Sequence, residues 1–313
     1  MDKKLQTYLT DESVFFNELI GKRMSGNRIP IEADYRRATK YIPEDKNSDN
    51  ELIDPYLYKI VQGDYIDELI ERIAKQSGNA LDICCGPGWL ALELARFGVN
   101  VDAYDISDIA IATGEKMLLE NPFPLGNGQV TYNCLDVNKI NFDKRKNDTI
   151  YGFSAFHHVY EFDKFMNNCY NNLNEGGLMV TFDDIGYTKM DSFFKNLFLF
   201  ILPTFELTYL DKFVRLFNYI FKGKLFSNEI YSPMEIYAAK HDVASDAILD
   251  FFTKKMKLEK MVYYGAFSVR VCNSISGPDW FRYTTSKFLT FLDKFLIKIG
   301  VCRGYYRIIY STK

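Results

Sequence analysis

The sequence predicts an α/β fold built on a doubly wound, mostly parallel sheet. Between residues 79 and 185, short apolar runs alternate with helical patterns, as they do where parallel strands are joined by crossover helices. Two more strand patterns, Leu258–Val271 and YYRIIYS, follow near the C-terminus. Because strands of this kind can pair antiparallel at a sheet edge, we expect seven strands in one sheet.

Five early strands are expected at NALDICC, VDAYDI, VTYNCLD, DTIYGFSAF and LMVTFDDI. Helical periodicity predicts an amphipathic helix at about Tyr65–Lys75 before them and another at Leu90–Phe97 after the first strand. Later in the chain it predicts helices at about Val243–Lys255 and Trp280–Ile299. Helices before, between and after the strands are what a doubly wound sheet requires.

The composition changes part-way along the 313 residues. Residues 187–313 hold 28 of the 50 aromatic residues and carry a net charge of +8, against −11 for residues 1–186. A chain of this length suits one large domain with an insertion, or two domains that share an interface. We divide it into an N-terminal helical extension (1–78), a ligand-binding α/β core (79–186), an aromatic-rich helical lid or substrate insertion (187–242) and a C-terminal completion of the core sheet (243–313).

Charge and cysteine usage exclude several classes of protein. A net charge of −3 argues against a uniformly basic surface that coats nucleic acid. The six cysteines show no zinc-ligand spacing, so we predict no metal site and a reducing compartment. The N-terminus has no apolar core of a signal peptide, and no apolar run is long enough to span a bilayer. We therefore expect a cytoplasmic protein without a nucleic-acid partner.

The segment LDICCGPGW is the most informative in the sequence. An apolar strand containing Asp82 runs into a turn with Gly86 and Gly88, and a helix follows. Glycines let the backbone turn sharply and approach a ligand, and the helix start offers unpaired N–H groups. Asp105 and Asp136 close the next two strands. Since ligands of open α/β sheets bind at the carboxyl ends of the strands, the three carboxylates predict one acidic rim.

These segments, together with AFHHVYEFDKF and LNEGGLMVTFDDI, resemble the class I S-adenosylmethionine-dependent methyltransferases of the small-molecule type. The resemblance implies a seven-stranded Rossmann-like sheet and S-adenosyl-L-methionine as the cofactor. It places Asp82 near the methionine part, Asp105 on the ribose and Asp136 near adenine. Where the family has its first glycine, this chain has Cys84. The cofactor-binding residues that we expect are Asp82, Cys84, Gly86, Gly88, Asp105, Ile106, Asp136, Val137 and Ser154.

The residues leave other interpretations open. Gly86 to Ala91 also fits the relaxed fingerprint of dinucleotide-binding enzymes, which makes a nicotinamide-dependent oxidoreductase an alternative. Asp82 before the loop and Asp136 beyond the third strand favour the methyltransferase, because its sulfonium and ammonium groups gain from acidic neighbours. The missing first glycine also allows a non-catalytic protein that binds the cofactor. For Asp82 alone, capping of the following turn is the structural alternative.

Two adjacent histidines follow the fourth strand. His157 or His158 could deprotonate an acceptor hydroxyl as a general base, although transfer to a carboxylate or phosphate would need no base. On an extended segment their side chains would point in opposite directions, so we expect one at most to face the site. As substrate contacts the sequence suggests Asp183, Tyr231, Glu235 and His241, each of which could equally be a solvated surface residue.

The acceptor is suggested by composition alone. Aromatic faces and cations suit an amphipathic or anionic molecule. We expect a small or amphipathic metabolite, with O-methylation of a glycan, lipid-linked or secondary-metabolite intermediate as the leading case. The helix FRYTTSKFLTFLDKFLIKIG has the periodicity of either core packing or interfacial docking. Contact with a membrane surface is therefore part of the prediction, with a well-packed insertion as its alternative.

Overall fold

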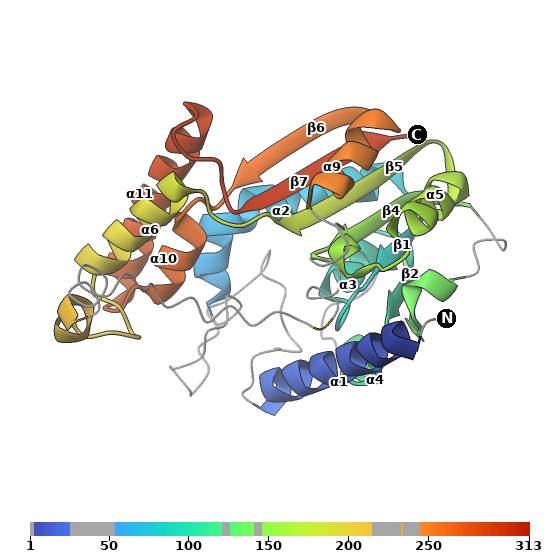
Figure 1. Cartoon of the computed structure of the whole chain (residues 1–313), viewed down its shortest axis with the longest axis horizontal. Helices are drawn as coiled ribbons and strands as arrows, with labels where there is room; N and C mark the ends of the chain where they lie inside the picture. Colours follow the sequence, from blue (N-terminus) through green and yellow to red (C-terminus); the bar gives the residue numbers. More distant parts are fainter. Residues whose placement is uncertain (1–2, 26–53, 121–125, 141–145, 215–232, 234–244) are drawn as a thin grey trace.

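The computed structural model describes residues 3–25, 54–120, 126–140, 146–214, 233 and 245–313. Its centre is a seven-stranded sheet in the order β3-β2-β1-β4-β5-β7-β6 (Figure 1). The strands are β1 (Asn79–Ile83), β2 (Asn100–Asp105), β3 (Val130–Cys134), β4 (Asn147–Phe153), β5 (Leu173–Asp184), β6 (Lys257–Tyr264) and β7 (Tyr306–Thr312). The predicted seven-stranded α/β sheet is confirmed.

The strand directions place the functional edge of the sheet. β1 pairs parallel with β2 and β4, and the parallel set extends to β3 and β5. β7 lies antiparallel between β5 and β6, as expected for the two late strands. The chain order reverses between β1 and β4, and open α/β sheets bind ligands at the carboxyl ends beside such a reversal.

One predicted strand is too long. The pattern Leu258–Val271 predicted a single strand, but β6 ends at Tyr264 and residues 268–274 form helix α10. Gly265 takes a positive φ of 70°, which stops the extended backbone. The Asp293 carboxylate then accepts hydrogen bonds from the amides of Phe267 (2.8 Å) and Ser268 (3.1 Å). This tertiary cap satisfies the first N–H groups of a helix, so apolar valines that would suit a strand lie on a helix instead.

Helices cover both faces of the sheet. On one face α2, α3, α10 and α11 pack against residues such as Ala80, Tyr151 and Val180. On the other, α5 and α9 pack against Leu81 and Met179. The helices are α1 (Lys3–Ser25), α2 (Pro55–Gln76), α3 (Trp89–Arg96), α4 (Asp108–Glu120), α5 (Phe162–Asn172), α6 (Lys189–Ile201), α9 (Ser245–Lys254), α10 (Ser268–Ser274) and α11 (Asp279–Lys298).

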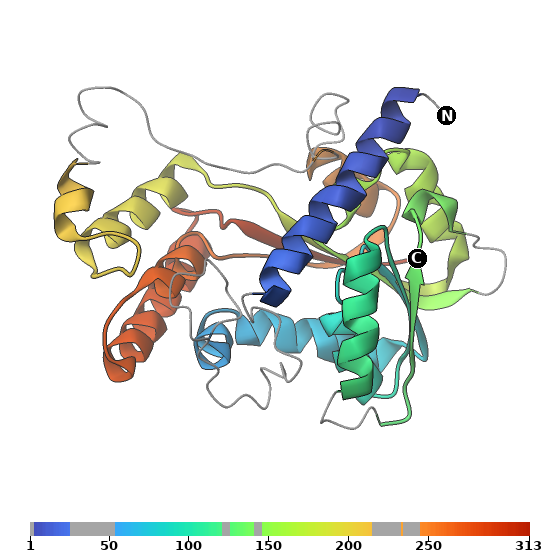
Figure 2. The same cartoon turned by 90° about the horizontal axis from the view of Figure 1, so that it is seen from below.

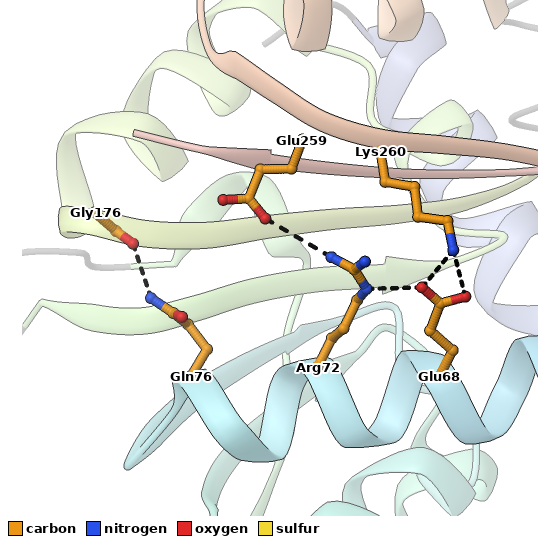
Figure 3. Close-up of polar contacts among 6 residues, drawn as sticks. All are labelled: Glu68, Arg72, Gln76, Gly176, Glu259 and Lys260. Atoms are coloured by element: carbon orange, nitrogen blue, oxygen red, sulfur yellow. Dashed lines mark hydrogen bonds and ion pairs between the residues drawn. The ribbon is translucent and has the colours of Figure 1, made fainter.

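Polar contacts tie α2 to the far edge of the sheet (Figure 3). The Glu68 carboxylate accepts from the Lys260 ammonium at 2.6 and 2.7 Å and from Arg72 at 2.8 Å. Burial raises the pKa of Glu68, but the hydrogen bonds from Lys260 and Arg72 outweigh it and lower the pKa below its usual value. Gln76 also donates to the Gly176 carbonyl at 2.9 Å. α2 therefore holds β6 and the start of β5 in place.

Three helices gather beyond the carboxyl edge of the sheet. α6 follows β5, α10 follows β6 and α11 precedes β7, so all three are joined to that edge (Figure 1). Thr188 and Asp191 form a reciprocal capping box at the start of α6, as short polar residues do at helix N-termini. Of the predicted insertion 187–242, the structure describes residues 187–214 and 233. Among the described helices, none has the length and apolar character to cross a bilayer.

The N-terminal helix α1 lies beside α4 (Figure 2). The Ser13 hydroxyl donates to the Ile106 carbonyl at 3.2 Å, and the Asn17 amide donates to Asp108 at 2.7 Å. The Ser107 hydroxyl donates to Asn17 at 2.6 Å. Because residues 106–108 follow β2 directly, α1 crosses the carboxyl edge of the sheet. Nothing in the sequence pattern of this helix indicated that position.

Candidate functional site

The loop between β1 and α3 is a glycine turn with space on one side. Gly86 has a φ of 54°, and a Cβ built on it would meet nothing within 4 Å. Gly88 has a φ of 70° and immediately precedes α3, but a Cβ there would clash with the Tyr132 ring. Gly88 is therefore required by packing inside the protein, whereas Gly86 exposes backbone to open space where a ligand can approach.

Cys84 occupies a backbone position that glycine normally fills. Its φ of 54° is in the left-handed region, and Ser154, which follows β4, has a φ of 51°. For a residue with a side chain this conformation costs about 1–2 kcal/mol. Strained residues of this kind gather at ligand sites, and these two lie at the ends of the two strands that flank the reversal. The turn thus keeps its shape without the glycine that the sequence lacks.

Asp105, the last residue of β2, holds the glycine loop. One carboxylate oxygen accepts from the Gly86 amide at 2.8 Å and the other from the Ser107 amide at 2.8 Å. Burial raises the pKa of Asp105, although the hydrogen bonds from the Ser107 and Gly86 amides lower it. Each carboxylate oxygen can accept a second hydrogen bond, so Asp105 can fix the loop and still accept from a sugar hydroxyl.

Asp82 lies inside β1, one residue before its end, and is buried with 2% of its surface exposed. It faces its register partner Tyr151 on β4, whose hydroxyl donates to it at 3.0 Å. Burial raises the pKa of Asp82 well above its usual value, the hydrogen bond from Tyr151 lowers it, and the charge of Asp105 raises it further. This carboxylate is therefore poised to gain from a nearby cation.

Asp136 follows β3 and caps the short helix Val137–Lys139. Its carboxylate accepts from the Asn138 amide at 3.0 Å and from the Tyr160 hydroxyl at 3.3 Å. Val137 is buried in the core. Asp136, for which the sequence suggests an adenine contact, thus also fixes the backbone on this side of the site.

Four carboxylates converge around the thiol of Cys84. Burial raises its pKa most, and the charges of four acids raise it further: Asp105, Glu12, Asp82 and Asp136. The three carboxylates of the predicted rim are therefore close together in space. The fourth, Glu12, comes from α1 and was missed by the sequence analysis, because no local motif marks it. Burial and these charges therefore disfavour the Cys84 thiolate, which is the nucleophilic form.

Glu12 contacts one of the two predicted histidines. Its carboxylate lies 2.8 Å from Nδ1 of His158, and both side chains are largely buried, at 4% and 14% exposure. Phe16 packs edge-on against the same ring, with 5.6 Å between centroids. The expected extended conformation is wrong: residues 156–158 form a helical turn, and the rings of His157 and His158 lie 4.2 Å apart. Both imidazoles therefore face the same region.

The predicted substrate residues have mixed positions. Asp183 is buried, where it accepts from the Thr181 hydroxyl at 2.7 Å and forms an ion pair with Arg307 on β7 at 3.4 Å. Its neighbour Asp184 is exposed. The ion pair joins β5 to β7, and a substrate role for Asp183 stays a prediction. The remaining three candidates lie outside the described residues: Tyr231, Glu235 and His241.

Part of the chain is similar to a known protein family. A family profile described as a methyltransferase domain matches residues 58–197. The match covers less than half of the chain, so this stretch is similar to a methyltransferase domain. The matched stretch runs from α2 through most of α6, so it contains the glycine loop, the three rim carboxylates and both histidines.

Solved structures similar to this chain share little sequence with it. An S-adenosylmethionine-dependent methyltransferase from Mesorhizobium loti is 14% identical, with a TM-score of 0.45 over 82% of this chain and 100% of that one. Magnesium protoporphyrin IX methyltransferase from Synechocystis is 12% identical, with a TM-score of 0.45 over 82% and 87%. The [4+2]-cyclase SpnF is 11% identical, with a TM-score of 0.49 over 100% and 97%. A search of curated proteins finds no match.

Proposed function

We propose that this protein transfers the methyl group of S-adenosylmethionine to a small or amphipathic metabolite. The observation that carries the proposal is the set of carboxylates around the glycine loop, with Asp82 on β1, Asp105 at the end of β2 and Asp136 just after β3. A cofactor with an ammonium and a sulfonium group gains more from such a rim than an anionic dinucleotide does. The matched family profile points to the same chemistry.

The residues present fit this cofactor. Asp82, buried and with a raised pKa, suits the cationic methionine part, and Asp105 has acceptor capacity left for ribose hydroxyls. Asp136 and Val137 would flank the adenine. Space beside Gly86 allows close approach to the backbone, and we propose that Cys84, Gly88, Ile106 and Ser154 complete the binding site.

When bound, the cofactor would supply a methyl group on a positively charged sulfur. The acceptor would attack the methyl carbon, and the sulfur would be the leaving group. The protein has to align the acceptor and exclude water, and such positioning can contribute on the order of 7–11 kcal/mol. α1 crosses the edge of the sheet and contributes Glu12 and Phe16 beside His158. We therefore assign to α1 the role of covering the site during the reaction.

We further propose that His158 is the general base and that Glu12 positions it. A proton on Nδ1 would be donated to the Glu12 carboxylate at 2.8 Å, which fixes the tautomer with Nε2 as the basic nitrogen. Nε2 would then take the proton of an acceptor hydroxyl, and Glu12 would stabilise the imidazolium. A carboxylate–imidazole pair favours a hydroxyl as the acceptor of O-methylation, because a carboxylate or phosphate acceptor has no proton to remove. His157, at 4.2 Å from His158, is the alternative base.

For the acceptor we propose a glycan, lipid-linked or secondary-metabolite intermediate. The aromatic and basic second part of the chain supports an amphipathic or anionic molecule. Asp183, Tyr231, Glu235 and His241 remain the proposed substrate contacts. A methyl-labelled cofactor incubated with fractionated small molecules and lipids would identify the acceptor class by the fraction that takes up the label.

Cofactor binding tests the proposal first. Native mass spectrometry of the purified protein should show bound S-adenosylmethionine or its demethylated product. Asp105→Ala should abolish this binding without unfolding the protein, since the Gly86 amide loses its acceptor. Asp163→Asn, an exposed carboxylate on α5, is the control and should bind normally. Preference for a nicotinamide dinucleotide would refute the proposal, and binding without transfer to any acceptor would favour a non-catalytic protein.

A further inference from the structure

Helix α11 exposes four of its six aromatic residues. Its buried residues are Ser286, Leu289, Thr290 and Asp293, of which three are polar. Phe288 and Phe291, by contrast, are 61% and 68% exposed. A surface helix normally buries its apolar stripe and exposes its polar residues. The large exposed side chains of α11 and the turn after it are Trp280, Phe288, Phe291, Phe295, Ile299 and Val301.

The polar buried face has a structural reason. Asp293 accepts from the amides of Gly265 (3.2 Å), Phe267 (2.8 Å) and Ser268 (3.1 Å), and so caps α10. The outer residues Phe288, Phe291, Phe295 and Ile299 follow the spacing i, i+3, i+7 and i+11, which is one stripe along the helix. The stripe is therefore not a core face, and packing within the described chain does not account for it.

Apolar exposure is concentrated in this part of the molecule. Of the 21 large apolar residues exposed in the described chain, 15 lie in residues 187–214 and 277–303. α6 exposes a second stripe at Met190, Phe193, Leu197 and Ile201. α10 packs against both α6 and α11, and the three helices form one group in both views (Figures 1 and 2). Large exposed apolar patches mark interaction surfaces.

The charges beside the α11 stripe are positive. Lys287, Lys294 and Lys298 follow the spacing i, i+7 and i+11, which places them on one line along the flank of the stripe. Lys294 pairs with Asp64 of α2 at 2.6 Å, so the positive charge of this flank comes from Lys287 and Lys298. The acids of α11 are engaged elsewhere, because Asp293 is buried and Asp279 pairs with Arg282. An aromatic stripe flanked by lysines suits the surface of an anionic membrane, where long lysine stems reach the headgroups. Protein interfaces, by contrast, are depleted in lysine.

We propose that α11 docks in the interfacial region of an anionic lipid membrane, with its aromatic stripe among the acyl chains. α6, α10 and α11 all leave from the carboxyl edge of the sheet, so docking brings that edge to the lipid surface. An amphipathic acceptor could then reach the site without leaving the bilayer. The inference goes beyond methyl transfer, because membrane binding can be measured without cofactor or acceptor.

Vesicle flotation tests the docking. The full chain should float with vesicles of equimolar phosphatidylcholine and phosphatidylglycerol and bind vesicles of phosphatidylcholine alone much more weakly. Lys287→Glu with Lys298→Glu should weaken binding to the anionic vesicles by more than 25-fold, since one interfacial lysine accounts for about fivefold. Phe288→Ser with Phe291→Ser and Phe295→Ser should abolish it. The matched controls are Lys75→Glu with Lys116→Glu and Phe97→Ser with Leu119→Ser, all exposed and on other helices or their ends, and they should float like the wild type.

Each result decides the proposal. Equal flotation of wild type and both α11 variants would overturn it, as would equal binding to neutral and anionic vesicles. A dimer in light scattering that the aromatic substitutions convert to monomer, without vesicle binding, would show that a second copy covers the stripe. Circular dichroism and cofactor binding of the same variants show whether they are folded. If the wild-type protein did not bind the cofactor, only the proposed methyl transfer would be contradicted. The docking result would still stand.

Discussion

Replacing Asp82 by asparagine removes an ionisable group from the interior and preserves the shape of the side chain. The carboxylate is buried, accepts from Tyr151 and has a pKa raised well above its usual value by burial, with the charge of Asp105 adding to the effect. Without a ligand, the folded protein therefore holds this carboxylate at a cost. An amide can still accept from the Tyr151 hydroxyl and avoids that cost.

The substitution should have two opposite effects: it should stabilise the ligand-free protein and weaken cofactor binding. Burial of an ion costs several kcal/mol, and a hydrogen bond to a charged group returns about 1.5–3 kcal/mol. Asp82→Asn should thus stabilise the ligand-free protein by about 1–2 kcal/mol and raise Tm by about 2–4 °C. A cation about 4 Å from a carboxylate is attracted by about 4 kcal/mol at an effective dielectric constant of 20. After the cost of ionising Asp82, we expect about 10–100-fold weaker binding of S-adenosylmethionine by the variant.

The raised pKa of Asp82 also fixes the sign of the pH dependence. The folded protein keeps this proton at pH values where the unfolded chain has lost it. Its contribution to stability therefore falls as pH rises from the ordinary carboxyl range through the raised folded value. A cationic ligand favours the ionised form, so affinity should rise over the same interval with release of a proton. Titration calorimetry in two buffers with different ionisation enthalpies counts that proton.

Scanning calorimetry and titration calorimetry of Asp82→Asn decide the matter. Asp163→Asn, exposed on α5, should change neither Tm nor affinity. A lower Tm for Asp82→Asn together with unchanged affinity would refute the reasoning, because the buried carboxylate would then serve the fold and not a cation.

Three further changes have defined outcomes. Glu12→Gln should lower kcat by about 10–100-fold and alter the pH profile of kcat without changing cofactor affinity, because the charge-assisted hydrogen bond to His158 is lost; an unchanged profile would make the contact structural. Cys84→Gly should relieve about 1 kcal/mol of left-handed strain, partly offset by chain entropy, so a clear fall in the urea midpoint would contradict it. Glu68→Gln should lower the free energy of unfolding by about 1 kcal/mol at pH 7. Since the folded pKa of Glu68 is lowered, wild type and variant should converge in stability as pH falls below the ordinary carboxyl range. A constant difference at low pH would be inconsistent with the ion pair.

The sequence predicted the sheet because its signals are local. Alternating apolar runs and helical patterns set all seven strands, and YYRIIYS forms the antiparallel β7. The end of β6 was wrong because its cause is tertiary: Asp293, more than 20 residues further along the chain, caps the start of α10. β-Branched valines favour a strand locally, and the helical cap that Asp293 supplies to α10 is not visible in the local sequence.

The candidate site was predictable where strand ends carry the chemistry. Asp82, Asp105 and Asp136 could be identified because parallel strands bring their carboxyl ends to one edge. Glu12 could not, since it lies 146 residues from its partner His158 and reaches the site only through the packing of α1. The orientation of the two imidazoles also depends on a helical turn that the short run of residues after β4 did not indicate.

A crystal structure with S-adenosylhomocysteine bound tests the central claim most directly. The account predicts ribose hydroxyls on Asp105, the adenine beside Asp136 and Val137, and the amino acid end of the ligand towards Asp82. Electron density for the nucleoside at any other edge of the sheet, or for a nicotinamide dinucleotide across Gly86 and Gly88, would contradict it.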